Sequence, residues 1–155
     1  MRRENSQLLM VARESSRTAV CGRFQRFGCK SASAMTFKSA IPVLRIFNEA
    51  KAKEFYVEFL GFSVDWEHRV GENFPLYQSV SLGGCVLHLS EHHGDCSPDG
   101  AVRIEASNVR ALREALHHKD YKYAKPGVNR QPWGTDEMSI TDPFGNRLTF
   151  YTPVA

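Results

Sequence analysis

The chain has 155 residues with a net charge of +3, and its 42% hydrophobic and 24% charged residues are typical of one globular domain. No stretch approaches the roughly 20 apolar residues that a membrane-spanning helix needs, so we expect no membrane partner. Residues 1–34 carry seven basic and two acidic residues, which leaves thirteen basic and fifteen acidic residues in 35–155. The larger segment is slightly acidic, which argues against nucleic acid as its main partner.

The first 34 residues form a basic leader without a sustained hydrophobic period. Three interpretations stay open: an organellar transit peptide, against which Glu4 and Glu14 stand, a flexible basic arm, or an extension upstream of a natural start at Met35. We favour the third because Met35 leads directly into the first predicted strand. We expect residues 1–34 to be disordered and dispensable, and residues 35–155 to form the folded domain.

The four cysteines form no CxxC pair, and the folded segment has enough apolar residues to build a core without disulfides. We therefore predict reduced thiols and a cytoplasmic protein. The cysteines are Cys21, Cys29, Cys85 and Cys96.

The first half of the folded segment predicts a strand, a helix and three further strands. Residues 39–47 are rich in β-branched and aliphatic residues, Asn48 is a good helix cap, and Gly61 ends a helix with apolar residues at helical spacing. Turn residues separate the next three strands, which we predict at 62–69, 76–82 and 85–90.

The second half repeats this order after a turn-rich linker at 93–100. A strand is predicted at 101–106, a helix follows Asn108, and short strands follow around 121–124, 136–141 and 147–152. The sequence thus predicts an α+β fold of two βαβββ modules, about 39–92 and 100–152. Their paired curved mixed sheets would surround a concave groove, with the helices on the outer faces.

The alternation of side chains along each strand predicts which residues line the groove. Apolar residues such as Leu44, Leu87 and Leu148 would face the helices. The opposite face is too polar to be core, and it holds Arg45, His88, Arg103, Glu105 and Tyr151.

Short motifs lie at corresponding places in this pattern. The first strand contains IPVL at 41–44, the first helix is followed by LGF at 60–62, and RQPWG at 130–134 precedes TDPFGN at 141–146. With these motifs the chain resembles the vicinal-oxygen-chelate superfamily of glyoxalase-like and bleomycin-resistance proteins. The QPWG segment resembles the bleomycin-resistance branch.

Enzymes of this superfamily bind one divalent metal with four groove-facing ligands, and the resemblance places those positions at Ile41, His88, Ala101 and Thr149. A single imidazole cannot hold a catalytic metal, which needs about three protein ligands. The nearby Glu91 would point to the opposite face from His88 on an extended strand, and the adjacent His92 and His93 would diverge from each other. We therefore predict no metal site, no cofactor and no catalytic residue.

The resemblance implies a site for a bleomycin-type antibiotic, which is large and cationic and carries a flat bithiazole. Such a ligand needs aromatic surface for stacking and carboxylates for its charge. Asp65 and Trp66 lie where the resistance proteins carry an acid and an aromatic residue, although Phe62, Val64 and Trp66 also alternate onto one face, as in a core. The predicted ligand-binding residues are Asp65, Trp66, Phe74, His88, Glu105 and Trp133.

The leading prediction is a homodimeric protein that sequesters a bleomycin-like glycopeptide without turnover. The alternative is a metal-independent lyase or isomerase on the same scaffold, acting on a small anionic metabolite. Arg45 and Arg103 would hold that anion, and His88 would be the general acid or base. A binding module for an unrelated small molecule is a third option.

Overall fold

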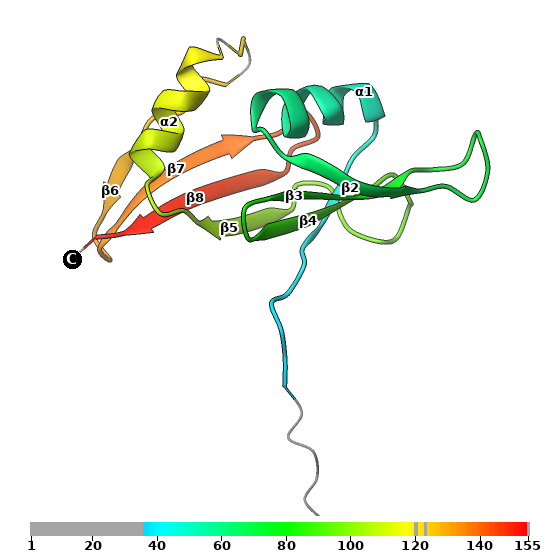
Figure 1. Ribbon diagram of the computed structural model, residues 1–155, viewed down its shortest axis with the longest axis horizontal. Helices are drawn as coiled ribbons and strands as arrows, with labels where there is room; N and C mark the ends of the chain where they lie inside the picture. Colours follow the sequence, from blue (N-terminus) through cyan, green and yellow to red (C-terminus); the bar gives the residue numbers. More distant parts are fainter. Residues whose placement is uncertain (1–35, 120, 123, 155) are drawn as a thin grey trace, which may run out of the picture. The chain divides into compact units, whose positions relative to one another are not determined.

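Figure 1 shows a computed structural model of the protein, which describes residues 36–119, 121–122 and 124–154. The chain divides into two units, residues 1–38 and 39–155. In the first unit only residues 36–38 are described, and they form no helix or strand. The expectations for the leader, residues 1–34, therefore lie outside the described residues.

The second unit contains two modules with the same order of elements. The first consists of β1 (Val43–Arg45), α1 (Glu49–Ala52), the π-helix η1 (Lys53–Phe59), β2 (Ser63–His68), β3 (Tyr77–Leu82) and β4 (Cys85–Ser90). The second consists of β5 (Ala101–Glu105), α2 (Val109–His118), β6 (Asn129–Gln131), β7 (Thr135–Thr141) and β8 (Arg147–Pro153).

Each module builds one four-stranded mixed sheet, in the orders β1-β4-β3-β2 and β5-β8-β7-β6. The first strand of each module pairs in parallel with the last, and the other pairs are antiparallel. The predicted α+β fold of two βαβββ modules is confirmed. None of the helices in the described part of the chain is long and apolar enough to cross a membrane.

Both predicted helix caps are present. The side chain of Asn48 accepts a hydrogen bond from the backbone N–H of Lys51 at 2.9 Å, and that of Asn108 accepts one from Ala111 at 3.0 Å. The first helix changes from α to π geometry after Ala52 and ends at Phe59, and Gly61, whose φ of 88° suits glycine, follows the C-cap residue Leu60.

Two predicted strands differ from the structure. The strand expected at 121–124 is absent from the described residues there, and its place in the sheet is taken by β6. The ring of Tyr121 stacks on Phe59 with centroids 4.3 Å apart, so this aromatic residue packs against the first helix instead of joining a sheet. The strand expected at 39–47 shortens to Val43–Arg45, and its N-terminal limit follows from Pro42, which has no N–H to donate to a ladder.

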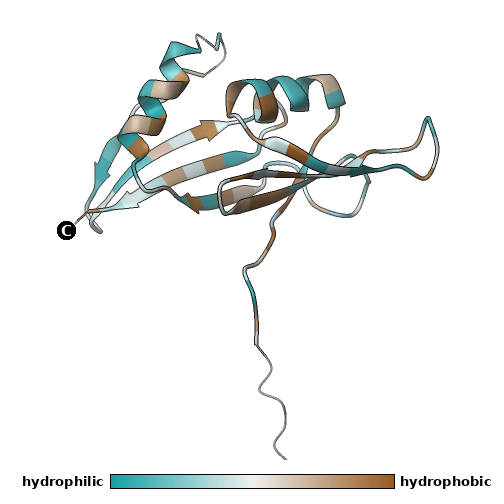
Figure 2. Cartoon of the chain, viewed as in Figure 1, coloured by the Kyte–Doolittle hydropathy of each residue, from teal (hydrophilic) through white to brown (hydrophobic). Residues whose placement is uncertain are grey.

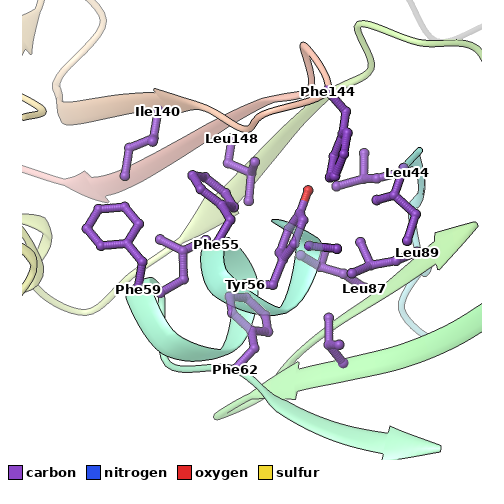
Figure 3. Close-up of a cluster of buried hydrophobic side chains, with 14 of the residues drawn as sticks. Leu44, Phe55, Tyr56, Phe59, Phe62, Leu87, Leu89, Ile140, Phe144 and Leu148 are labelled. Atoms are coloured by element: carbon purple, nitrogen blue, oxygen red, sulfur yellow. The ribbon is translucent and has the colours of Figure 1, made fainter. Parts of the chain in front are cut away.

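The core lies between the sheets and the helices, and the predicted inward-facing residues Leu44, Leu87 and Leu148 are all buried there. Figure 2 shows the alternation of hydrophobic and hydrophilic residues along the strands. In Figure 3, side chains from both modules surround Tyr56. The Tyr56 hydroxyl donates to Asp142 at 2.7 Å, which joins the first helix to the turn before β8.

The edge strands of the two sheets lie close to each other. Asn146, in the turn before β8, donates to the backbone oxygen of Arg45 at 2.7 Å and accepts from the N–H of Gly100 at 3.2 Å. Figure 1 shows α1 and α2 on the same side of the sheets. Within residues 39–154 no helix covers the opposite sheet faces, which we call the open faces.

Candidate ligand-binding site

A β-bulge in β2 decides what the first open face carries. Val64 pairs with Val80 and Trp66 pairs with Ser79, so Asp65 is the extra residue of the bulge. The bulge breaks the alternation of the strand and places Asp65 and Trp66 on the same, open face. The alternative in which Phe62, Val64 and Trp66 share a core face is therefore wrong: Phe62 is 2% exposed and Trp66 is 45% exposed.

Trp66 belongs to a compact aromatic cluster with Tyr77 and His88, which we call the Trp66 cluster. Its indole stacks on Tyr77 with centroids 5.9 Å apart and an interplanar angle of 14°, and it meets His88 edge-on at 5.2 Å. The Tyr77 hydroxyl and His88 Nδ1 share a hydrogen bond of 2.9 Å. The cluster presents a flat aromatic surface that is fixed by contacts on two sides.

A carboxylate flanks this surface. Asp65 accepts hydrogen bonds from the hydroxyls of Ser79 at 3.0 Å and Ser81 at 2.6 Å. Asp65 is exposed, so its charge is available to a cationic ligand stacked on Trp66. Tyr77 is not among the residues predicted for this site, although the alternation of side chains along β3 places it on the same face as Ser79.

On the second open face, Glu137 is the centre of a hydrogen-bond network. Its carboxylate accepts two bonds from Arg103, at 2.6 and 3.2 Å, and one from Thr135 at 2.7 Å. It also accepts from the indole N–H of Trp133 at 2.8 Å. These donors, Arg103 first among them, lower the pKa of Glu137 to about 2, so the carboxylate is ionised at neutral pH.

The remaining predicted site residues lie in two further places. Glu105 is on the second open face, where it accepts a 3.2 Å hydrogen bond from Tyr151. Phe74 is in the hairpin between β2 and β3, 54% exposed, beside a hollow of about 370 Å³. No ring contact among the described residues joins Phe74 to the Trp66 cluster. The structure therefore unites Asp65, Trp66 and His88 and separates Phe74 from them.

The two arginines expected in the groove have different surroundings. Arg103 holds Glu137 through both of its terminal nitrogens and lies over the ring of Tyr151, with the guanidinium carbon 4.9 Å from the ring centroid. An anionic ligand would have to compete with Glu137 for this guanidinium. Arg45 forms no ion pair with any carboxylate that the structure describes.

The residues at the superfamily's metal positions do not fit a catalytic metal. His88 shares its Nδ1 with Tyr77, and Thr149 is hydrogen-bonded to Ser139 at 3.0 Å. Glu91 accepts from the N–H of Leu76 at 2.9 Å, so its carboxylate is held by the backbone. Nowhere in the described segments do three or more His, Cys, Asp or Glu side chains gather as metal ligands.

Comparisons with known proteins agree with this fold. The sequence pattern of glyoxalase superfamily proteins matches residues 26–155. No curated protein sequence gives a significant match.

Among solved structures, a bleomycin-binding protein from bleomycin-producing Streptomyces verticillus, complexed with copper(II)-bleomycin, is similar at 28% identity. The match covers 78% of this chain and 98% of that one, with a TM-score of 0.58. A glyoxalase-related enzyme from Clostridium phytofermentans is similar at 22% identity, covering 79% and 100%, with a TM-score of 0.63. A bleomycin resistance determinant encoded on the transposon Tn5 is similar at 18% identity, covering 76% and 98%, with a TM-score of 0.60.

Proposed function

Because the chain belongs to the glyoxalase superfamily, we propose that it is a binding protein that sequesters a bleomycin-type antibiotic without turnover. The observation that carries the proposal is the bulge that sets the carboxylate of Asp65 beside the exposed, stacked indole of Trp66. The similarity to the Streptomyces verticillus bleomycin-binding protein, at 28% identity over 98% of that chain, supports the same choice of ligand.

The proposed mechanism is stoichiometric capture. A flat heteroaromatic group of the drug stacks on Trp66, and its cationic tail lies near Asp65. Trp133 offers a second exposed indole, 65% exposed and anchored through its N–H, with Glu105 on the same sheet. The held drug cannot reach its target, and no bond is made or broken.

We infer that two copies of the chain complete the site. In one chain the open faces have no covering element within residues 39–154, and the indoles of Trp66 and Trp133 are exposed on them. A second chain placed on these faces would convert an open aromatic surface into a walled groove. Symmetric pairing of this kind is the commonest form of protein assembly.

A reducing compartment suits this protein. Cys85 and Cys96, the two cysteines within the described residues, are both free thiols, and neither is in a disulfide. We therefore propose a cytoplasmic location, in which the protein would bind a drug that has entered the cell.

The alternative enzyme has less support. It needs Arg45 and Arg103 together on an anionic substrate, and Arg103 is already held by the two oxygens of Glu137. Its proposed acid or base, His88, shares a hydrogen bond with the Tyr77 hydroxyl. Among the carboxylates that the structure describes, none forms a hydrogen bond with His88 that would orient it.

The test is calorimetric titration of metal-stripped protein with bleomycin. We expect about one drug per chain, and an affinity reduced roughly tenfold by Trp66→Ala, equivalent to ~1.4 kcal/mol. The matched control is Val70→Ala, which truncates an exposed apolar residue, 71% exposed, in the neighbouring hairpin. Absence of binding at about 100 μM drug, or equal losses in the two variants, would contradict the proposal.

A further inference from the structure

A hollow of about 540 Å³ lies at the end of β1, apart from the residues proposed to hold the drug. Its lining comes from the C-terminal end of β1 and from the segment that follows β4: Arg45, Phe47, His93, Gly94, Asp95, Cys96, Ser97 and Pro98. We propose that this hollow binds a small molecule through a carboxylate group, with the guanidinium of Arg45 as the anion-binding group.

The hydrogen bonding of Arg45 is incomplete. Its Nη1 is buried and has no hydrogen-bond partner among the described residues. A buried donor without an acceptor costs free energy that an incoming acceptor would recover. The planar guanidinium, with N–H groups in a fixed fork, matches the two oxygens of a carboxylate.

Aromatic packing holds this guanidinium in place. Its central carbon lies 5.0 Å from the centroid of the Phe47 ring, and the Phe47 ring meets Phe144 edge-on at 6.1 Å. Phe144 is itself buried at 9% exposure, so Phe47, and through it the guanidinium of Arg45, packs against the hydrophobic core. A positioned cation loses little conformational freedom on binding an anion, which favours a preformed site.

The opposite wall of the hollow is also fixed. The Ser90 hydroxyl donates to Asp95 at 2.6 Å and accepts from the N–H of His92 at 3.1 Å, which ties the segment after β4 to the end of that strand. His93 and Cys96 form a β-bridge across the turn. Ser97 adds a hydroxyl donor to the lining.

The charges of this wall select the class of anion. Asp95 carries a negative charge into the lining but forms no ion pair with Arg45 in the part of the chain that is described. Burial raises the pKa of the Cys96 thiol, and Asp95 raises it further against the opposing effect of Arg45, so the thiol is neutral at pH 7. Asp95 repels a ligand with two negative charges more strongly than a ligand with one, so a lining with one guanidinium and one carboxylate favours a carboxylate ligand over a phosphate dianion.

The experiment is an NMR titration of the full chain with benzoate, in the absence of bleomycin. We expect saturable shifts of the backbone signals of residues 45–47 and 93–98, with a dissociation constant in the millimolar range. Arg45→Gln should weaken binding roughly tenfold or more, and Arg45→Lys by less, because it keeps the charge and loses the fork. The control is Arg113→Gln on α2, which removes the same charge from the second module and should leave the affinity unchanged.

The variant Asp95→Asn keeps the proposal testable if Arg45→Gln does not fold. Asp95→Asn retains an oxygen that can accept from Ser90 and removes the repelling charge, so benzoate should bind more tightly. Inorganic phosphate should bind more weakly than benzoate to the wild type and should gain more from this variant. Benzoate shifts at other residues, or affinities that neither Arg45→Gln nor Asp95→Asn alters, would overturn the proposal. Neither result depends on whether the protein binds bleomycin.

Discussion

The indole N–H of Trp133 donates to the carboxylate of Glu137 at 2.8 Å, so the most exposed tryptophan of the chain is tethered to an acid that is only 8% exposed. Trp133 lies in the turn between β6 and β7, directly before Gly134, whose φ of 82° permits the tight return of the chain. This hydrogen bond fixes the orientation of the Trp133 indole, which is otherwise exposed to solvent. Glu137 is therefore a positioning residue for the second aromatic surface of the proposed site.

Replacing Glu137 by Gln tests this role. The amide has one acceptor oxygen where the carboxylate has two, and its NH₂ group would face a guanidinium N–H of Arg103. We expect bleomycin affinity to fall by about threefold to tenfold, with lower fluorescence anisotropy of Trp133 in a Trp66→Phe background.

Glu72→Gln is the matched control for that variant, because Glu72 is exposed in the β2–β3 hairpin. It should change neither affinity nor anisotropy. Unaltered anisotropy in Glu137→Gln would show that the hydrogen bond does not hold the ring.

The stability of the protein should depend on pH through the same carboxylate. Hydrogen bonds from Arg103, Thr135 and Trp133 lower the pKa of Glu137 from 4.5 to about 2. A carboxyl group whose pKa is lower in the folded state stabilises the fold fully above its unfolded value, and that stabilisation is lost as the pH falls.

We therefore expect the free energy of unfolding to decrease as the pH falls from 4.5 toward 2, measured by urea denaturation at a series of pH values. Asp136, whose pKa is also lowered by hydrogen bonds from Arg130 and Arg110, contributes in the same direction. In Glu137→Gln the free energy of unfolding should decrease less over the same pH range. An identical pH dependence in the wild type and in Glu137→Gln would show that this carboxylate is not its source.

The limits of sequence-based prediction are visible in β2 and in the Arg103–Glu137 pair. Both helix caps and the inward-facing residues Leu44 and Leu148 follow from local spacing, and each was predicted correctly. The bulge at Asp65 follows from the pairing of β2 with β3, and the residues of β2 alone do not predict that pairing.

The pair of Arg103 with Glu137 has a similar origin. Arg103 pairs with Thr149 on β8, and Thr149 pairs with Ser139 on β7, two residues from Glu137. Alternation alone places each side chain on the open face, but only the register of three strands brings them together. The sequence therefore predicts on which face of a sheet a side chain lies better than it predicts which side chain it contacts there.

The buried hydroxyl of Tyr56 offers a test of the contact between the modules. It donates to Asp142 at 2.7 Å, and burial, together with this carboxylate, raises the pKa of Tyr56 well above its ordinary value. Tyr56→Phe removes the donor and leaves Asp142 with one hydrogen bond fewer. We expect a loss of about 1–3 kcal/mol in the free energy of unfolding by urea denaturation.

Tyr151→Phe provides the comparison for Tyr56→Phe. Its hydroxyl donates over 3.2 Å to Glu105, which is exposed, so water can replace the lost bond. The loss should be a few tenths of a kcal/mol. Equal losses of unfolding free energy in the two variants would show that burial of the Tyr56 hydroxyl does not increase the cost of removing its hydrogen bond.

The proposed dimer leads to a prediction about the two tryptophans. Trp66 and Trp133 are 45% and 65% exposed in one chain, and both lie where a second copy would cover the open faces. Covering an indole removes apolar surface from water, which favours association and shifts tryptophan emission to shorter wavelength. We therefore expect sedimentation at twice the mass of one chain at micromolar concentration. On dilution, dissociation and a shift of the emission to longer wavelength should occur together. A protein that sediments as a single chain at micromolar concentration, with emission independent of dilution, would contradict the dimer and leave the site open on one side.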